Sequence, residues 1–273
     1  MSTQSQRRAN GIDLIRTLSN GAYDETRAAQ AMVRRHGALG TFGLDHVLGN
    51  LWSRPQLSRR DRSLVVLGFL ITIGAQEELE AHAQGALGHG LSRAEVEEVI
   101  LQVAGYAGFP MAMQASRVVA SVWCELDGIE RLPAREEAAL LEDEERWRNA
   151  TDVLDTLFAG RAGADPEKAR ANIVASMGGV GELAFDFAFG ELWSRDVLSR
   201  RDRSLATIAI LAIQRCHDEL KIHIRGALNH GVTRDEVEEV MVQLTVYRGF
   251  PSGVEGMRVA REIFARMDKK PQT

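Results

Sequence analysis

The sequence predicts an all-α protein built from two tandem copies of one helical domain. Three observations predict this fold class: a long internal repeat, helix start and stop signals at matching places in both copies, and the lack of any stretch with the alternating pattern of a β-strand. The 273 residues are 45% hydrophobic, which is normal for a globular protein able to bury a sizeable core.

The repeat defines the domain boundaries. LWSRPQLSRRDRSL at Leu51–Leu64 reappears as LWSRDVLSRRDRSL at Leu192–Leu205, and the likeness continues at the same shift through GLSRAEVEEVILQVAGYAGFP and GVTRDEVEEVMVQLTVYRGFP. We therefore expect copy one over residues 1–127 and copy two over residues 149–273. Residues 128–148 between them are rich in charge, which predicts a linker with a solvated helix.

Within each copy the first strong helix signal is a serine before an apolar run. Ser58 and Ser199 are suitable N-caps for helices over residues 58–74 and 199–214, whose later residues are apolar enough for a buried position. The next predicted helix spans residues 77–90 in copy one and 218–231 in copy two. Gly90 and Gly231 are suitable as the residues that follow its C-terminus.

The remaining helices also carry terminal signals. Ser92-Arg-Ala-Glu95 and Thr233-Arg-Asp-Glu236 have the spacing of capping boxes and predict the start of the next helix. Pro110 and Pro251 predict its end and the first turn of a last helix.

Composition excludes several function classes. The net charge of −5, with basic and acidic residues interspersed, provides no basic field for nucleic acid. No window reaches the roughly 18–20 apolar residues that cross a bilayer, and the N-terminus lacks a signal-peptide core, so we expect a cytoplasmic protein without membrane contact. Cys124 and Cys216 are the only cysteines and are far apart, which argues against disulfides and Cys-x-x-Cys sites.

The candidate catalytic groups are a glutamate and a histidine that recur in EELEAHAQGALGHG (77–90) and DELKIHIRGALNHG (218–231). On a helix, Glu78 and His82 lie one turn apart on one face, as do Glu219 and His223. A carboxylate within hydrogen-bonding reach would fix the imidazole tautomer and raise its basicity for proton transfer. The alternative is an ordinary i,i+4 surface pair.

Other residues of the repeat have two interpretations each. His89 and His230 are best explained as cations at the C-terminus of their helix. Gly85 leaves room for a ligand or for a closely packed helix. One helix with a glutamate and one or two histidines supplies too few ligands for an obvious metal site, so we expect none.

Six further residues are candidates for binding a substrate. Two arginines could hold a carboxylate with two nitrogens or could be solvated, two tryptophans could wall a pocket or pack in the core, and two tyrosines could donate a hydroxyl to a ligand or to the backbone. They are Arg62 and Arg203, Trp52 and Trp193, and Tyr106 and Tyr247.

The ordered motifs LWSRPxLSRRDRSL, ELxxHxxGALxxG and SRxEVEEVxxQxxxYxGFP make both halves resemble the carboxymuconolactone decarboxylase family, an all-α group that includes the alkylhydroperoxidase-D-like proteins. The likeness covers residues 51–119 and 192–261. It implies that the fused copies pack as an internal pseudo-dimer, and that three chains assemble into a pseudo-hexamer.

The family has two chemical branches. In the peroxidase branch the helix carries Cys-x-x-Cys-x-x-x-His, whereas here the second Cys is Glu78 or Glu219 and the first is Ala75 or Cys216. The position of that branch's relay Glu is Ser63 or Ser204. A dithiol cycle needs two thiols within reach of each other, so we expect no peroxidase activity.

The decarboxylase branch resembles this sequence more closely. It implies a lyase or isomerase that needs no cofactor and acts on a small acidic lactone such as 4-carboxymuconolactone or a related ring acid. His82 and His223 would act as acid and base, Glu78 and Glu219 would orient them, and the arginines would bind a carboxylate. The alternatives are a non-catalytic small-molecule-binding or assembly protein and a residual redox protein.

Overall fold

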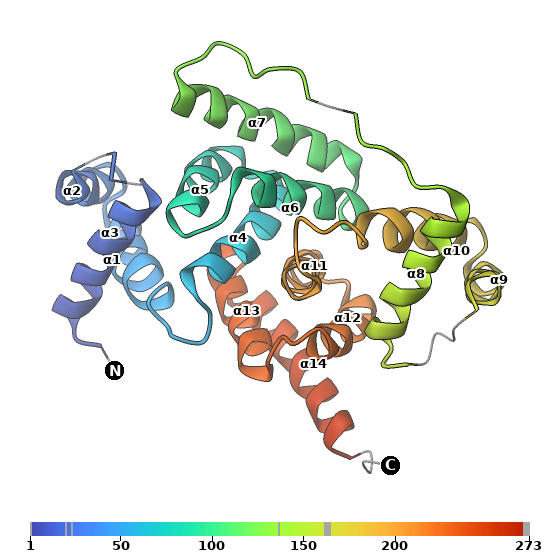
Figure 1. Ribbon diagram of the computed structural model, residues 1–273. Coiled ribbons are helices and arrows are strands. Elements are labelled where there is room, and N and C mark those ends of the chain that lie inside the picture. Colours follow the sequence, from blue (N-terminus) through green and yellow to red (C-terminus); the bar gives the residue numbers. More distant parts are fainter. Residues whose placement is uncertain (1, 20, 23, 136, 161–164, 270–273) are drawn as a thin grey trace.

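The computed structural model describes the chain except for residues 1, 20, 23, 136, 161–164 and 270–273, and its described part is helical with no β-strand, which confirms the predicted class (Figure 1). Copy one forms α1 (Gln4–Leu18), α2 (Glu25–His36), α3 (Ala38–Phe42), the π-helix η1 (Gly43–Leu51), α4 (Arg59–Ile73), α5 (Gln76–Gly88), α6 (Arg93–Tyr106) and α7 (Phe109–Asp127). Copy two forms α8 (Asp143–Leu157), α9 (Pro166–Met177), α10 (Gly179–Leu183), the π-helix η2 (Ala184–Leu192), α11 (Arg200–Gln214), α12 (His217–Asn229), α13 (Arg234–Tyr247) and α14 (Phe250–Asp268).

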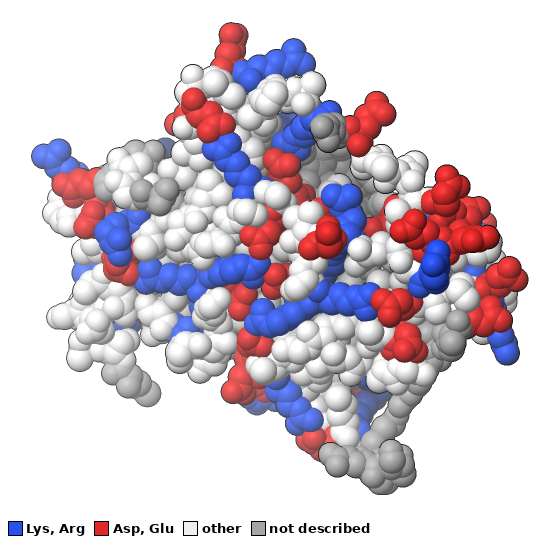
Figure 2. All heavy atoms as spheres, in the orientation of Figure 1, with Lys and Arg blue, Asp and Glu red and all other residues white. Residues whose placement is uncertain are grey.

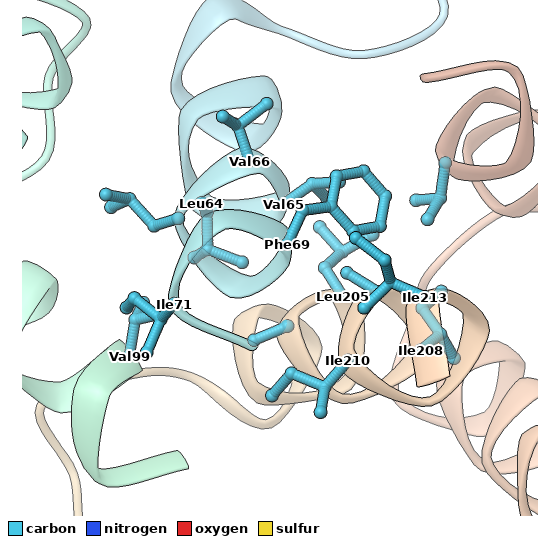
Figure 3. Packing of buried hydrophobic residues seen from close by; sticks show 14 of the residues in the cluster. Leu64, Val65, Val66, Phe69, Ile71, Val99, Leu205, Ile208, Ile210 and Ile213 are labelled. Atoms are coloured by element: carbon cyan, nitrogen blue, oxygen red, sulfur yellow. The ribbon is translucent and has the colours of Figure 1, made fainter. Parts of the chain in front are cut away.

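The two copies share one core. Figure 1 shows α1–α3 and α8–α10 at opposite ends of the molecule, with α4 and α11 between them. These two central helices pack directly against each other, and apolar side chains from both interdigitate (Figure 3). Because the buried cluster runs without a break from α4–α7 into α11–α14, the copies form an internal pseudo-dimer.

The predicted helix starts are confirmed. The side chains of Ser58 and Ser199 accept hydrogen bonds from the backbone N–H groups of Asp61 and Asp202, both at 3.1 Å. Complete capping boxes begin α6 and α13, and prolines stand in the first turn of α7 and α14. Gly90 and Gly231 have φ of 98° and 89°, the left-handed backbone expected after the ends of α5 and α12.

The connection between the copies begins where α7 ends, at Asp127. Its described residues, 128–135 and 137–142, form no helix or strand, and α8 begins at Asp143, inside the range 128–148 that was expected to be a linker with a solvated helix. Figure 1 shows this segment passing along the outside of the molecule.

Gly85 and Gly226 allow a close helix approach. A Cβ on Gly85 would lie 2.4 Å from Leu18 Cδ2, and one on Gly226 would lie 2.0 Å from Leu157 Cδ1. These glycines therefore let the ends of α1 and α8 pack on α5 and α12, which settles their role in favour of helix packing.

The surface in Figure 2 carries acidic and basic side chains side by side. Within the described residues, no helix combines the length and the apolar character needed to span a bilayer.

Candidate active site

His82 lies on α5 in an aromatic enclosure made by both copies. Its ring stacks on Trp52, with ring centroids 5.7 Å apart and an interplanar angle of 19°. Tyr247, at the C-terminal end of α13 in copy two, approaches the same imidazole edge-on at 6.1 Å. Trp52 is the C-cap residue of η1, so the π-helical segment sets its position.

His223 on α12 has the equivalent enclosure with the copies exchanged. Its ring stacks on Trp193 at 6.1 Å and meets Tyr106 of copy one edge-on at 5.2 Å. Trp193 Nε1 also donates a hydrogen bond to the Tyr106 hydroxyl at 2.7 Å. Each centre thus takes its histidine and tryptophan from one copy and its tyrosine from the other.

His223 is buried and His82 is partly buried, and the loss of water around the rings keeps both imidazoles neutral. The Nδ1 atoms of His82 and His223 are buried and have no hydrogen-bond partner among the described residues. Burial and, to a smaller extent, a neighbouring histidine, His89 or His230, together lower the pKa of His82 and of His223 to about 4. At neutral pH each centre therefore offers an uncharged base in a largely apolar setting.

The predicted hydrogen bond between glutamate and histidine is absent. In the described part of the chain no hydrogen bond or ion pair joins Glu78 to His82 or Glu219 to His223, and both glutamates are exposed. An acidic residue in the first turn of a helix is stabilised by the helix dipole and by water. The carboxylate is therefore more stable at the surface than beside the histidine in the aromatic enclosure.

His89 was expected to be a cation at a helix end, and that expectation is wrong. It is 9% exposed, and its ring nitrogens Nδ1 and Nε2 lie 2.7 Å from Ser63 Oγ and 2.9 Å from Thr17 Oγ1. Burial lowers its pKa to about 4.

His230 repeats this arrangement. Its Nδ1 lies 2.8 Å from Ser204 Oγ and its Nε2 lies 3.0 Å from Thr156 Oγ1, and burial lowers its pKa to about 4. The two C-terminal histidines are therefore neutral members of buried polar networks beside Trp52 and Trp193.

Arg62 and Arg203 are fully buried and already hold carboxylates of the other copy. Arg62 Nη2 donates to Glu239 at 2.8 Å, and Arg203 Nη2 donates to Glu98 at 2.6 Å. The expectation of an arginine free to bind a substrate with two nitrogens therefore does not hold, because Nη2 is occupied in each case.

The glutamates in these ion pairs were missed by sequence reasoning. Glu98 and Glu239 are the third glutamates of the repeated EVEEV motif, and each also accepts a hydrogen bond from an arginine that follows the tryptophan, Arg195 or Arg54, at 2.8 Å. The sequence signal that could have identified them is that both glutamates recur at the same place in a helix with apolar residues at helical spacing. They join the two copies through ion pairs.

Trp52 and Trp193 are 2% and 1% exposed, so they belong to the core and also form one wall around a histidine. Burial raises the pKa of Tyr106 and Tyr247, which keeps both hydroxyls protonated at neutral pH. Cavities of about 270 Å³ and 550 Å³ exist elsewhere, and neither is lined by His82 or His223.

The helix that carries His223 has a single thiol at its N-cap, Cys216. Burial raises its pKa, and Ala75 occupies the matching place in copy one. Both cysteines of the chain are free.

The buried histidines make stability depend on pH. An unfolded histidine has a pKa near 6.5, and the folded His82 and His223 have about 4, so protons bind the unfolded chain first. Stability from these groups is complete above about pH 6.5 and falls as the pH drops to about 4. Urea unfolding of the wild type from pH 7 to 4.5 should show this loss, and the variant with both histidines changed to Gln should show a smaller one; parallel slopes would contradict it.

Comparison with known proteins agrees with the repeat. The sequence profile described as "Carboxymuconolactone decarboxylase family" matches residues 43–121 and again residues 178–262. A 4-carboxymuconolactone decarboxylase of Acinetobacter baylyi is 42% identical over 86 residues, which are 32% of this chain and 64% of that protein. A nitrosuccinic acid decarboxylase of Metarhizium robertsii is 39% identical over 89 residues, which are 33% of this chain and 62% of that protein. The match thus spans less than two thirds of either relative.

Proposed function

The chain belongs to the carboxymuconolactone decarboxylase family, and we propose that it is a carboxy-lyase that removes CO2 from a small, activated carboxylic acid without a cofactor. The observation that carries this proposal is the pair of centres in which a buried neutral imidazole lies between a tryptophan and the other copy's tyrosine. The names of two relatives, one acting on a carboxylated lactone and one on a nitro acid, support the reaction type.

The chemistry needs a place for one electron pair and a source of one proton. When the bond to the leaving carboxylate breaks, CO2 departs and its electron pair moves toward an electron-withdrawing lactone or nitro group. The resulting carbanion then takes one proton. An apolar enclosure favours loss of CO2 because it removes water from the leaving carboxylate, and oriented donors stabilise the charge that develops.

We assign the proton transfer to His82 and His223. Burial holds them neutral, but an acidic substrate brings negative charge next to the ring and raises its pKa. The imidazole then takes up a proton on binding and donates it to the carbanion after CO2 has left. The donation leaves the ring neutral again, which is its starting state.

The remaining candidates have proposed supporting roles. Tyr106 and Tyr247 donate a hydroxyl hydrogen to the electron-withdrawing group, since their raised pKa keeps that hydrogen in place. Glu78 and Glu219 stabilise the imidazolium once it forms. Their i,i+4 spacing from the histidines supports this, since a change of rotamer brings the carboxylate toward the ring.

A substrate screen tests the proposed function. Purified protein would be supplied with 4-carboxymuconolactone, nitrosuccinate and related lactone acids, and CO2 release and ultraviolet absorbance would be recorded together. We expect CO2 release above the uncatalysed rate from at least one activated acid. Release that matches the buffer control for every acid would reject the proposal.

A second candidate function is a non-catalytic assembly protein on the same scaffold. The close enclosure of His82 and His223 favours it, because neither of the two cavities described above opens onto these rings. This alternative predicts that calorimetry detects no binding of the same acids and that no CO2 is released.

We also propose that three chains assemble through apolar residues repeated in both copies. Leu39 and Phe42 on α3 are 73% and 60% exposed, and their counterparts Val180 and Leu183 on α10 are 71% and 68% exposed. Exposed apolar groups recurring at matching places are typical of an interface.

Light scattering after size exclusion should give the mass of three 30.1-kDa chains. Changing Val180 and Leu183 to Glu should release smaller species, whereas Leu140→Glu, at an 82% exposed position in the linker, should not. A wild-type mass of one chain would contradict the assembly.

A further inference from the structure

The two centres differ in how their buried polar atoms are satisfied. In the copy-two centre, Trp193 Nε1 donates to Tyr106 at 2.7 Å, and Arg203 Nη1 donates to Gln102 Oε1 at 3.1 Å. Gln102 Nε2 in turn donates to Thr207 Oγ1 at 2.9 Å. This centre pairs these atoms with its own side chains, although Arg203 Nε and His223 Nδ1 stay unpaired among the described residues.

The copy-one centre leaves the same atoms without partners. Trp52 Nε1, Arg62 Nη1 and Gln243 Oε1 are buried and unpaired among the residues that the structure describes. Their side chains are at most 2% exposed. Buried polar atoms in native proteins nearly always have partners, so three additional unpaired atoms at one centre call for an explanation.

One substitution between the copies accounts for this difference. Thr207 of α11 corresponds to Val66 of α4, which has no hydroxyl group to receive the amide of Gln243. Gln243 Nε2 instead donates to the backbone carbonyl of Arg62 at 3.2 Å, so its oxygen no longer faces Arg62 Nη1. Both residues at this position are fully buried, so the change acts inside the centre.

The charge around the two centres also differs, because further acidic residues lie near the copy-two arginines, at positions where copy one has uncharged residues. In copy two, Asp196 and Glu191 add to the effect of Glu98 in raising the pKa of Arg195. The matching positions in copy one are Pro55 and Asn50, which carry no charge. In both copies two arginines share one buried glutamate, so the further acidic residues near the copy-two pair make the difference.

We propose that the copy-one centre is the substrate-binding centre of this chain, where Trp52 Nε1 and Arg62 Nη1 hold a carboxylate of the substrate beside His82, and that the copy-two centre is closed by its own hydrogen bonds. The unpaired atoms include two N–H donors, one of them charged, and a carboxylate is an acceptor that matches both. Tyr247 lies next to these donors: it meets His82 edge-on, and while burial raises its pKa, nearby Trp52 and the charge of Arg62 lower it. This inference rests on the proposed function.

Indole N–H signals in ¹⁵N spectra can test the proposal with muconolactone, which keeps a carboxylate but lacks the one that would leave. The signals would be assigned with Trp52→Phe and Trp193→Phe. In the wild type we expect the Trp52 signal to shift on titration while the Trp193 signal stays in place. Val66→Thr should restore the internal hydrogen bonds of copy one and weaken binding by about tenfold or more.

Thr207→Val is the matched variant, since it should open the copy-two centre and make the Trp193 signal respond. Melting temperatures would establish that both variants fold. A Trp193 response in the wild type, no response of either indole, or unchanged affinity in Val66→Thr would each overturn the inference.

Turnover separates this inference from the proposed function. CO2 release that persists in His82→Gln but stops in His223→Gln would place the reaction in copy two, so the inference would fall while the lyase stands. A Trp52 response without CO2 release from any acid would leave the binding centre in place and reject the lyase.

Discussion

Changing His82 and His223 together to glutamine is expected to lower kcat for CO2 release by about 10²–10⁴-fold, the usual contribution of a positioned acid or base. Glutamine keeps a polar side chain of moderate size but cannot take up and donate a proton in the neutral range. Because neither Nδ1 makes a hydrogen bond in the wild type, we expect little change in melting temperature. Steady-state kinetics with CO2 detection, together with calorimetry, measure both quantities.

His36→Gln is the control for this experiment, since His36 is exposed on α2 and lies outside both centres. It should retain the wild-type rate. Full activity in the double variant would exclude the histidines from the reaction, and a large loss of melting temperature would mean that the rings act mainly as packing groups.

Changing Glu239 to alanine is expected to lower the free energy of unfolding by about 3–5 kcal/mol, because it leaves Arg62 as a buried charge without its partner. Arg62 is fully buried, and Glu239 is its only carboxylate partner among the residues described. The pair joins α4 of copy one to α13 of copy two. The loss should therefore also weaken the contact between the copies.

The adjacent Glu238 provides a matched control. It forms an ion pair with Arg261 at the surface, where its side chain is 31% exposed, so Glu238→Ala should cost less than about 1 kcal/mol. Urea unfolding of the two variants gives the comparison. Equal effects would mean that the buried pair contributes no more than a surface pair.

Local features of the fold were predictable because their causes lie within a few residues. A capping box needs only Ser92 and Glu95, and a left-handed glycine such as Gly90 needs only the helix end before it. Because the sequence repeats, each of these local signals also predicted the matching element of the second copy. For this reason the sequence predicted the helices from α4 to α7 and from α11 to α14 together with their caps.

The π-helical segments η1 and η2 were not predicted. Their apolar spacing is similar to that of an α-helix, so the sequence pattern does not distinguish the two kinds of turn. They matter for the centres because Trp52 and Trp193 immediately follow them.

The composition of the centres depends on how the copies pack, which no local pattern encodes. Arg54 and Glu239 are 185 residues apart in sequence yet hydrogen-bonded, and Tyr247 meets His82 only because α13 lies against α4. The histidines, tryptophans and tyrosines that meet at the centres were all among the candidates from the sequence. From sequence spacing alone we expected Glu78 beside His82. In the structure, the packing of the copies places Trp52 and Tyr247 beside His82 instead.

The neutral state of the histidines is also a property of the packed structure. An imidazole on an exposed helix face would keep a pKa near 6.5. Enclosure between Trp52 and Tyr247 removes water from the ring and lowers that pKa to about 4. The proposed reaction cycle therefore couples substrate binding to proton uptake, a link that follows from burial rather than from the Glu-x-x-x-His motif.

The most direct measurement of the central claim is product analysis after turnover of an activated acid in D2O. We predict one CO2 for each substrate molecule consumed and one solvent deuteron on the product carbon that lost the carboxylate or on the carbon that shared its electron pair. A product that retains every carboxyl carbon, with no CO2 formed, would contradict the account and identify an isomerase instead of a lyase.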